Sequence, residues 1–588
     1  MLFSELTESF QAMGDTRKRL ELTEILRKLF QNAGDDLPQL AYLLQGKVLP
    51  DYYGVEMGIA DKLIIKALSH VSGKSEEEIQ EDYTKTGDLG QVAYNVTERK
   101  TQKALFSTSM TLDYVYQSLL KISKISGSGS IRVKTDIYTD LILNGTPADA
   151  MYITRIVSGK LRLGVSDATI LDALALAFTD SEKKEIATTA YNFHPDIGYI
   201  ADLLRKGKIE DLEKIGPEPM IPMKVMLAER LPDIGDILAK MEGTASLEYK
   251  YDGMRAQIHK KEKEVRIFSR SSEETTGQFP DIVKNVLSTF KADSLILDGE
   301  AVPFNPETGD LYPFQAVSQR RGRKYHLDEI SDDIPIVVFL FDILYKNGEP
   351  LQNLPYLKRR EILKETFQED NSFKLSSSLV TSNKDEAEKF IEESISSGCE
   401  GIVAKNITDK SIYRAGSRGW LWIKYKRDYE ANLGDSLDLV VIGAFSGHGR
   451  RKGTYGALLM ASYNNETGIY QSVCKLGTGF TDDVLFNLPK MFSEYTVKEK
   501  PANVQSGLIP DIWIIPNFVM EIVGSEITLS PIHSTAFGLI KEKAGLAIRF
   551  PRFTGKWRND KRPDDATTVN EIINMYKNQK KNIGNLLE

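Results

Sequence analysis

The hydrophobic pattern of this 588-residue chain changes its period at the segment Gly216-Pro217-Glu218-Pro219. Before this segment, apolar residues recur at helical spacing, as Leu22, Ile25 and Leu29 do. After it, short apolar runs such as Val337-Val338-Phe339-Leu340-Phe341 are typical of buried strands. Because two prolines within four residues stop a helix, the segment predicts a linker between a helical region and a mixed region.

A second change near residue 428 predicts three domains. We expect an all-α domain at residues 1–217, an α+β domain at residues 218–427 and a strand-rich domain at residues 428–588. The expected C-terminal strands are Leu437–Phe445, Gly456–Tyr463, Ile469–Leu476 and Ile512–Val523. A few short strands with one helix are typical of a small β-barrel such as the OB-fold. An amphipathic helix follows, with Thr567 or Thr568 as its N-cap.

Composition excludes several classes of protein. The chain is 41% hydrophobic and 27% charged, which is ordinary for a globular protein. Its formal net charge of -8 does not exclude a polyanionic partner, because local patches decide such binding. Cys399 and Cys474 are too few for a disulfide framework or a four-cysteine zinc site. With no signal peptide and no apolar run of about 20 residues, we expect a cytoplasmic protein that is not bound to a membrane.

The most informative short motif contains Glu248, Lys250, Asp252, Gly253 and Arg255. An amine attacks a phosphate only when it is neutral, and neighbouring cations favour that form. The Asp-Gly pair predicts a tight turn that brings the arginine back toward the lysine, where a guanidinium can bind a polyanion. An ordinary charged hairpin on the surface remains the alternative.

Charged residues recur downstream at the ends of apolar runs. They stand in Phe268-Ser269-Arg270, Leu297-Asp298-Gly299-Glu300, Phe341-Asp342, Glu400-Gly401-Ile402-Val403-Ala404-Lys405 and Trp420-Leu421-Trp422-Ile423-Lys424-Tyr425-Lys426. Taken singly, each carboxylate is more often a turn residue, and alternating lysines are usually a solvated strand face. Together they offer one nucleophile, several cations and carboxylates that suit Mg²⁺, which is the set that nucleotidyl transfer needs.

In their order, these motifs resemble the motif series of the covalent nucleotidyltransferases: ATP-dependent DNA ligases, RNA ligases and mRNA capping enzymes. Arg549-Phe550-Pro551-Arg552 and the segment from Asp560 to Thr567 resemble the last ligase motif, at the end of the OB-fold. Tyr152-Ile153-Thr154-Arg155 and the segment from Gly159 to Ser166 resemble the DNA-binding domain of archaeal and eukaryotic replicative ligases. The resemblance spans the whole chain and is to archaeal-type ATP-dependent DNA ligases.

This resemblance implies roles for individual residues. Lys250 would become covalently linked to AMP, while Glu248 and Phe341 would contact the adenine by hydrogen bonding and stacking. The remaining expected nucleotide contacts are Arg255, Arg270, Glu300, Arg418 and Lys424. Glu300 and Glu400 are the expected ligands of Mg²⁺ or Mn²⁺.

Basic residues outside this series suggest contacts with nucleic acid. Arg155, Lys160 and Arg162 lie around glycines, where a backbone can approach phosphates closely. Arg450 and Arg451 lie in a glycine-rich turn between two expected strands of the barrel, a place where OB-folds bind nucleic acid. For Arg155, Lys160 and Arg162, solvated charges at a helix connection are the alternative.

One segment predicts a protein partner. Gln102, Leu105 and Phe106 resemble the shortened sliding-clamp motif found at this place in archaeal ligases, with a glutamine and two apolar anchors. The alternative is a loop that tucks its apolar residues into its own domain.

The expected function is sealing of nicks in duplex DNA during replication, repair, recombination and cell division, by a nucleoid-associated monomer that uses ATP. An RNA ligase or capping enzyme is less favoured because those enzymes typically lack the helical domain. An NAD-dependent ligase is less favoured still, because it should carry a four-cysteine zinc site, which two cysteines cannot form. A catalytically silent scaffold would leave Lys250, Glu300 and Lys424 without a reason to occur together.

Overall fold

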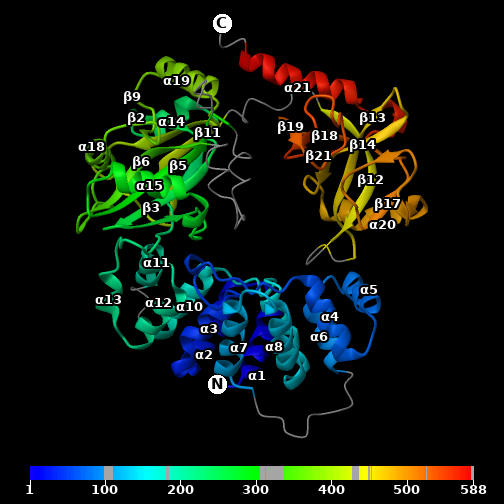
Figure 1. The fold of residues 1–588 in the computed structure, drawn as a ribbon, viewed down its shortest axis with the longest axis horizontal. Helices are drawn as coiled ribbons and strands as arrows, with labels where there is room; N and C mark the ends of the chain where they lie inside the picture. The colour runs from blue at the N-terminus through cyan, green and yellow to red at the C-terminus, as the bar shows by residue number, and fades with distance from the viewer. Residues whose placement is uncertain are drawn as a thin grey trace. The chain divides into compact units, whose positions relative to one another are not determined.

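The computed structural model describes residues 1–98, 110–179, 184–304, 311–312, 335–426, 436–447, 451, 453–524 and 526–584 (Figure 1). These residues form two compact units. The first unit comprises Met1–Glu76 and Leu89–Lys426, and the second comprises Glu77–Asp88 and Arg427–Glu588. The helical region and the α+β region therefore belong to one unit, and the division into three domains stays a prediction.

The first part of the chain is helical, as its apolar spacing predicts. In α2, Leu22, Leu26 and Leu29 form the buried face. Thr146 begins α9 with a capping box that includes Asp149. The helices are α1 (Phe3–Gly14), α2 (Arg19–Asn32), α3 (Leu37–Leu44), α4 (Asp61–Ser72), α5 (Glu76–Thr86), α6 (Leu89–Glu98), α7 (Leu112–Lys124), α8 (Ser130–Asn144), α9 (Pro147–Val157), α10 (Asp167–Phe178), α11 (Lys184–Phe193), α12 (Ile197–Arg205) and α13 (Ile209–Glu213).

The rest of the first unit contains two sheets. One has the strand order β1-β11-β10-β2-β9, and the other has the order β4-β3-β5-β6-β7 with β8 beside β6. Their strands are β1 (Leu227–Arg230), β2 (Ala245–Lys250), β3 (Met254–Lys261), β4 (Glu264–Phe268), β5 (Ser294–Pro303), β6 (Ile336–Lys346), β7 (Glu349–Pro350), β8 (Phe373–Leu375), β9 (Ser378–Thr381), β10 (Gly401–Asn406) and β11 (Arg418–Lys426). This arrangement confirms the expected α+β region.

Helices pack against both sheets. The helices α14 (Ile234–Lys240) and α19 (Lys384–Ser396) contact the first sheet, while α15 (Pro280–Thr289) and α18 (Tyr356–Thr366) contact the second. The core of the second sheet joins strand residues such as Ile258 and Leu297 to Val286 and Leu363 of these helices. Burying these apolar side chains fixes the strands that carry the polar groups described below.

The second unit is rich in strands. Its main sheet has the order β15-β17-β12-β13-β14-β16, and β18 pairs with β12 and β21 to bend the sheet into a half-barrel. The elements are β12 (Leu437–Ser446), β13 (Tyr455–Asn464), β14 (Ile469–Leu476), α20 (Asp482–Phe492), β15 (Thr496–Val497), β16 (Val504–Gln505), β17 (Ile512–Ile514), β18 (Val519–Val523), β19 (Glu526–Ser530), β20 (Gly545–Arg549), β21 (Arg552–Trp557) and α21 (Val569–Gly584).

Two details of this unit test the expected elements. The strand expected at Ile512–Val523 is wrong as a single element, because the chain forms β17 and β18 with Pro516 between them. Proline has no N–H to donate to a ladder, which explains the break. Thr568 is the N-cap of α21, since its hydroxyl accepts the Glu571 N–H at 3.2 Å.

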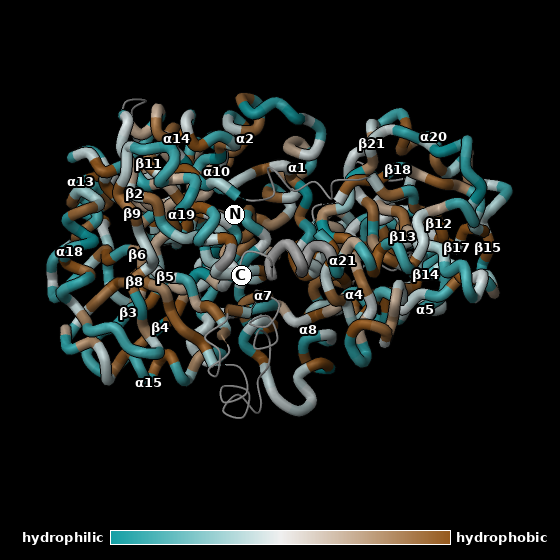
Figure 2. The backbone as a smooth tube through the Cα atoms, turned by 90° about the horizontal axis from the view of Figure 1, so that it is seen from above, coloured by the Kyte–Doolittle hydropathy of each residue, from teal (hydrophilic) through white to brown (hydrophobic). Residues whose placement is uncertain are grey.

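Hydropathy varies over short distances along the chain. Figure 2 shows brown stretches interrupted by teal along most elements. Within the described part of the chain, every helix is too short or too polar to cross a membrane.

Candidate active site

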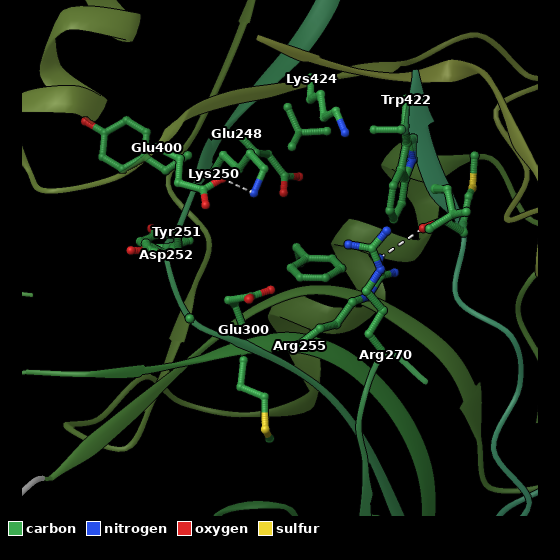
Figure 3. Close-up of a pocket in the computed structure, with 18 of the residues that line it drawn as sticks. Glu248, Lys250, Tyr251, Asp252, Arg255, Arg270, Glu300, Glu400, Trp422 and Lys424 are labelled. Carbon is green, nitrogen blue, oxygen red and sulfur yellow. Dashed lines mark hydrogen bonds and ion pairs between the residues drawn. The ribbon is translucent and has the colours of Figure 1, made fainter. Parts of the chain in front are cut away.

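A cavity of about 480 Å³ in the first unit is lined by residues from both sheets. This volume lies within the range of small-molecule sites in proteins. Figure 3 shows Glu248, Lys250, Glu300, Glu400 and Lys424 extending toward a common space. Every residue that the sequence predicted for nucleotide or metal binding lines it: Glu248, Lys250, Arg255, Arg270, Glu300, Phe341, Glu400, Arg418 and Lys424.

Strand register explains why charged residues gather on one face of the first sheet. In antiparallel pairing, Gly401 lies opposite both Lys250 and Lys426, and Val403 lies opposite both Glu248 and Lys424. Because side chains alternate along a strand, residues two apart share a face. The motif lysines and the glutamate therefore project from the same face, and a slip of one residue between the strands would place them on opposite faces.

Lys250, the last residue of β2, is paired with Glu400. Its Nζ lies 2.5 Å from Glu400 Oε2, and Nζ of Lys426 lies 2.8 Å from the same oxygen. Burial alone would raise the pKa of Glu400, but the two lysines outweigh it and hold that pKa below its ordinary value. One carboxylate thus pairs with two lysines that line the cavity.

Glycine is required beside this carboxylate. Gly401 has φ of 140°, and a Cβ at this position would lie 2.3 Å from the carbonyl oxygen of Tyr425. A side chain would force β10 away from β11 and separate Glu400 from Lys426. The Glu-Gly step of the motif is therefore a packing requirement as well as a chemical one.

Arg255 is held in place rather than free. Its Nε and Nη2 donate to the two oxygens of Asp298 at 3.0 and 2.6 Å, and Nη1 donates to the Met226 carbonyl at 3.0 Å. Burial lowers the pKa of Arg255, but Asp298, which is fully buried, more than offsets this and raises it overall. The guanidinium lies over the rings of Phe341 and Trp422. It therefore presents a fixed positive charge to the cavity.

Aromatic residues and a second buried ion pair stabilise the part of the cavity around Phe341. Phe341 contacts Trp422 edge to face, with ring centroids 6.1 Å apart. The next residue, Asp342, forms a fully buried bidentate pair with Arg359 of α18, at 2.7 and 2.9 Å. This pair anchors β6 directly behind Phe341, so it sets where that ring lies.

Glu300 sits opposite Arg255 in the β3–β5 pairing. Burial raises the pKa of Glu300 to about 7, although Lys250 and Arg255 oppose the shift. Lys424 shows the complementary effect, because burial and the neighbouring Lys426 lower its pKa. In each case the environment disfavours the charged form of the group, a type of perturbation that is common at functional sites.

Replacing Glu300 by glutamine is expected to stabilise the ligand-free protein at pH 8. The carboxyl has a folded pKa of about 7 and a reference value of 4.5, so the folded state holds its proton more tightly and stability falls as pH rises through this window. We expect Glu300→Gln to remove this loss, with a gain on the order of 2 kcal/mol at pH 8 and much less at pH 5. Thermal unfolding at pH 8 and at pH 5 measures this gain in stability. Equal gains at the two pH values would contradict the raised pKa of Glu300.

Sequence reasoning missed several residues of the site. Asp298 stands in one of the sequence motifs but was given no role of its own, although it holds Arg255. Lys405, which is 2% exposed, pairs with Glu248 at 2.9 Å, and Tyr356 donates to the same carboxylate. The Phe341 partner Trp422 was missed too. Their apolar surroundings in the sequence signalled only burial, and no local pattern shows which partners they meet.

The residues expected to contact DNA lie elsewhere. Lys160 pairs with Asp61 at 3.0 Å, Arg155 lies over the ring of Tyr152, and Arg162 is exposed with φ of 58°. Nη1 of Arg451 donates to the Gly456 and Gly477 carbonyls. Arg450 and the clamp residues Gln102, Leu105 and Phe106 lie outside the described residues.

Three family descriptions match successive parts of the chain. "DNA ligase N terminus" matches residues 2–175, "ATP dependent DNA ligase domain" matches residues 225–426, and "ATP dependent DNA ligase C terminal region" matches residues 451–561. The second of these contains the entire cavity described above.

Relatives match over nearly the full length. The protein named DNA ligase from Thermoplasma volcanium is 58% identical over 583 residues, covering 99% of each chain. DNA ligase 2 from Thermofilum pendens is 44% identical, covering 98% of each. A solved structure titled Pmar-Lig_PreS3 shares the fold with a TM-score of 0.56 at 17% identity, covering 94% of this chain and 99% of that one.

Proposed function

Because this chain belongs to the family of ATP-dependent DNA ligases, we propose that Lys250 is the residue through which it transfers AMP from ATP to a nick in duplex DNA. The observation that carries the proposal is the convergence of Lys250 with cations and carboxylates of two sheets on one cavity. An amine placed among fixed charges is the arrangement that nucleophilic catalysis on a phosphate requires.

The reaction consists of three phosphoryl transfers. First, Nζ of Lys250 attacks the α-phosphorus of ATP; a P–N bond forms, the bond to the β-phosphate oxygen breaks, and pyrophosphate leaves. Next, an oxygen of the DNA 5′-phosphate attacks the same phosphorus and the P–N bond breaks. Finally, the 3′-hydroxyl attacks the activated 5′-phosphate and AMP leaves. The covalent intermediate divides one difficult reaction into easier steps.

The cavity residues take distinct roles in this scheme. Glu248 accepts a hydrogen bond from the adenine, and Phe341 stacks on it. Arg255, held by Asp298, and Arg270 contact ribose and phosphate, while Arg418 and Lys424 meet the phosphates from the opposite sheet. The charge of Arg255 is fixed before the substrate arrives, so it needs little reorganisation as charge moves onto pyrophosphate.

Glu300 and Glu400 would hold Mg²⁺ or Mn²⁺. Among the described residues, no group of three or more histidine, cysteine or acidic side chains is placed to bind a metal. Two carboxylates beside a phosphate site nevertheless fit Mg²⁺, which keeps several waters and uses substrate phosphates as ligands. When bound, the ion would polarise the phosphate oxygens. Glu400 also pairs with Lys250 and Lys426, so it orders these lysines when no ion is bound.

The wider partners follow from the DNA substrate. We place nicked duplex DNA against Arg155, Lys160 and Arg162 of the helical region and against Arg450 and Arg451, since basic side chains supply most of the affinity for a phosphate backbone. We also propose that a sliding clamp binds Gln102, Leu105 and Phe106. The enzyme acts as a monomer and is located at the nucleoid.

Labelled ATP tests the proposed function. Incubation of the protein with ATP carrying a label on the α-phosphate, together with Mg²⁺, is expected to leave one adenylate on Lys250, located by peptide mass spectrometry. Addition of nicked duplex DNA should then discharge the label as AMP while the nick is sealed. A label on another residue, or stronger labelling by GTP than by ATP, would contradict the proposal.

A further inference from the structure

The carboxylate of Glu248 is held by two buried donors. Its Oε2 lies 2.9 Å from Nζ of Lys405, and its Oε1 accepts a hydrogen bond from the Tyr356 hydroxyl. Glu248 and Lys405 are each 2% exposed, and Tyr356 is 1% exposed. Each oxygen of the carboxylate is therefore fixed by one protein donor, and its remaining lone pairs are available to a ligand in the cavity that Glu248 lines.

The ammonium of Lys405 is itself enclosed by aromatic rings. It lies 4.8 Å from the ring centres of Phe341 and Tyr356 and 4.6 Å from that of Trp422. It also donates to the Phe341 carbonyl at 3.3 Å. Burial lowers the pKa of Lys405, and the Glu248 carboxylate opposes that shift. The three aromatic rings, the Phe341 carbonyl and the Glu248 carboxylate together stabilise the buried ammonium of Lys405.

We propose that Lys405 is the positioning residue for base selection: by holding Glu248 as a charged acceptor, it makes the cavity accept a purine with a 6-amino group and reject one with a 6-oxo group. This inference rests on the proposed function. A carboxylate can only accept hydrogen bonds, so it pairs with the 6-amino group of adenine and repels the lone pairs of a 6-oxo group. A site built on a buried polar contact discriminates strongly, because the wrong base leaves that contact unmade.

Removing the charge of Lys405 should weaken this discrimination. A buried carboxylate without a cation takes up a proton, and the neutral acid can then donate to a 6-oxo group. The decisive quantity is therefore the ratio of self-labelling rates with ATP and with ITP, whose bases differ at position 6. A lysine that served only the fold would lower both rates together and leave their ratio unchanged.

We expect Lys405→Met to lower the ATP-to-ITP rate ratio by at least about tenfold. Lys405→Gln, which keeps a donor without the charge, should lower it in the same direction and replaces the methionine variant if that one does not fold. Thermal unfolding of each variant reports folding independently of nucleotide recognition. Lys260→Met is the matched control: Lys260 is 6% exposed and donates to the Phe290 and Ala292 carbonyls, outside the cavity.

The control should leave the ratio as in the wild type, even if the protein unfolds at a lower temperature. In a Glu248→Gln background, Lys405→Met should have little further effect on the ratio, because Lys405 acts through that carboxylate. An unchanged ratio in folded Lys405→Met or Lys405→Gln would overturn the inference, as would a full effect in the Glu248→Gln background. A wild-type protein that takes up no label from ATP would instead contradict the proposed function, and with it this inference.

Discussion

Replacing Lys250 by alanine is expected to abolish the transfer of AMP from ATP to the protein, because it removes the amine proposed to form the covalent link. Nick sealing from ATP should fall to background. Sealing of a nick whose 5′-phosphate already carries AMP should partly survive, since that step needs no protein nucleophile. Labelled ATP and pre-adenylated nicked DNA, assayed side by side, measure the two steps.

Lys426 provides a matched control for this substitution. Its ammonium pairs with the same Glu400 oxygen, and its side chain is 27% exposed against 25% for Lys250. Lys426→Ala removes a cation but no nucleophile, so we expect a rate of self-labelling lower by roughly a hundredfold, with a labelled adduct still formed. If Lys250→Ala retained label on any residue, or if Lys426→Ala alone lost it completely, the assignment of the nucleophile would be wrong.

Replacing Arg359 by methionine is expected to destabilise the first unit by about 3–5 kcal/mol, because it leaves Asp342 buried without a counter-charge. Both side chains are fully buried, and the guanidinium also donates to the Leu354 and Ser411 carbonyls. Since Asp342 follows Phe341 in β6, affinity for ATP should fall as well. Thermal or urea-induced unfolding, with nucleotide binding measured at low temperature, tests both effects.

Two further variants separate the charge from the packing. Arg359→Met combined with Asp342→Leu replaces the pair by apolar side chains and should recover much of the lost stability. Lys358→Met, on the same helix, breaks an exposed pair with Glu361 and should change stability by less than about 0.5 kcal/mol. A loss for Arg359→Met no larger than that for Lys358→Met would mean that the buried pair contributes little.

The cavity residues could be predicted because their spacing repeats the geometry of strands. Glu248 and Lys250 are two apart in β2, and Lys424 and Lys426 are two apart in β11, so each pair shares a face whatever the rest of the chain does. One strand boundary was predicted wrongly. Pro516 divides the expected last long strand, and its missing N–H could have indicated the break from sequence alone.

The sequence by itself determined the helical and strand-rich regions and the candidate nucleophile with the charged residues around it, because periodicity and motif spacing are local properties of a chain. Tertiary structure alone decided which charges meet. Lys405 reaches Glu248 only through the register of β10 against β2, and Arg359 reaches Asp342 only through the packing of α18 on β6. Such pairings depend on contacts between distant segments, and spacing along the chain carries no information about them.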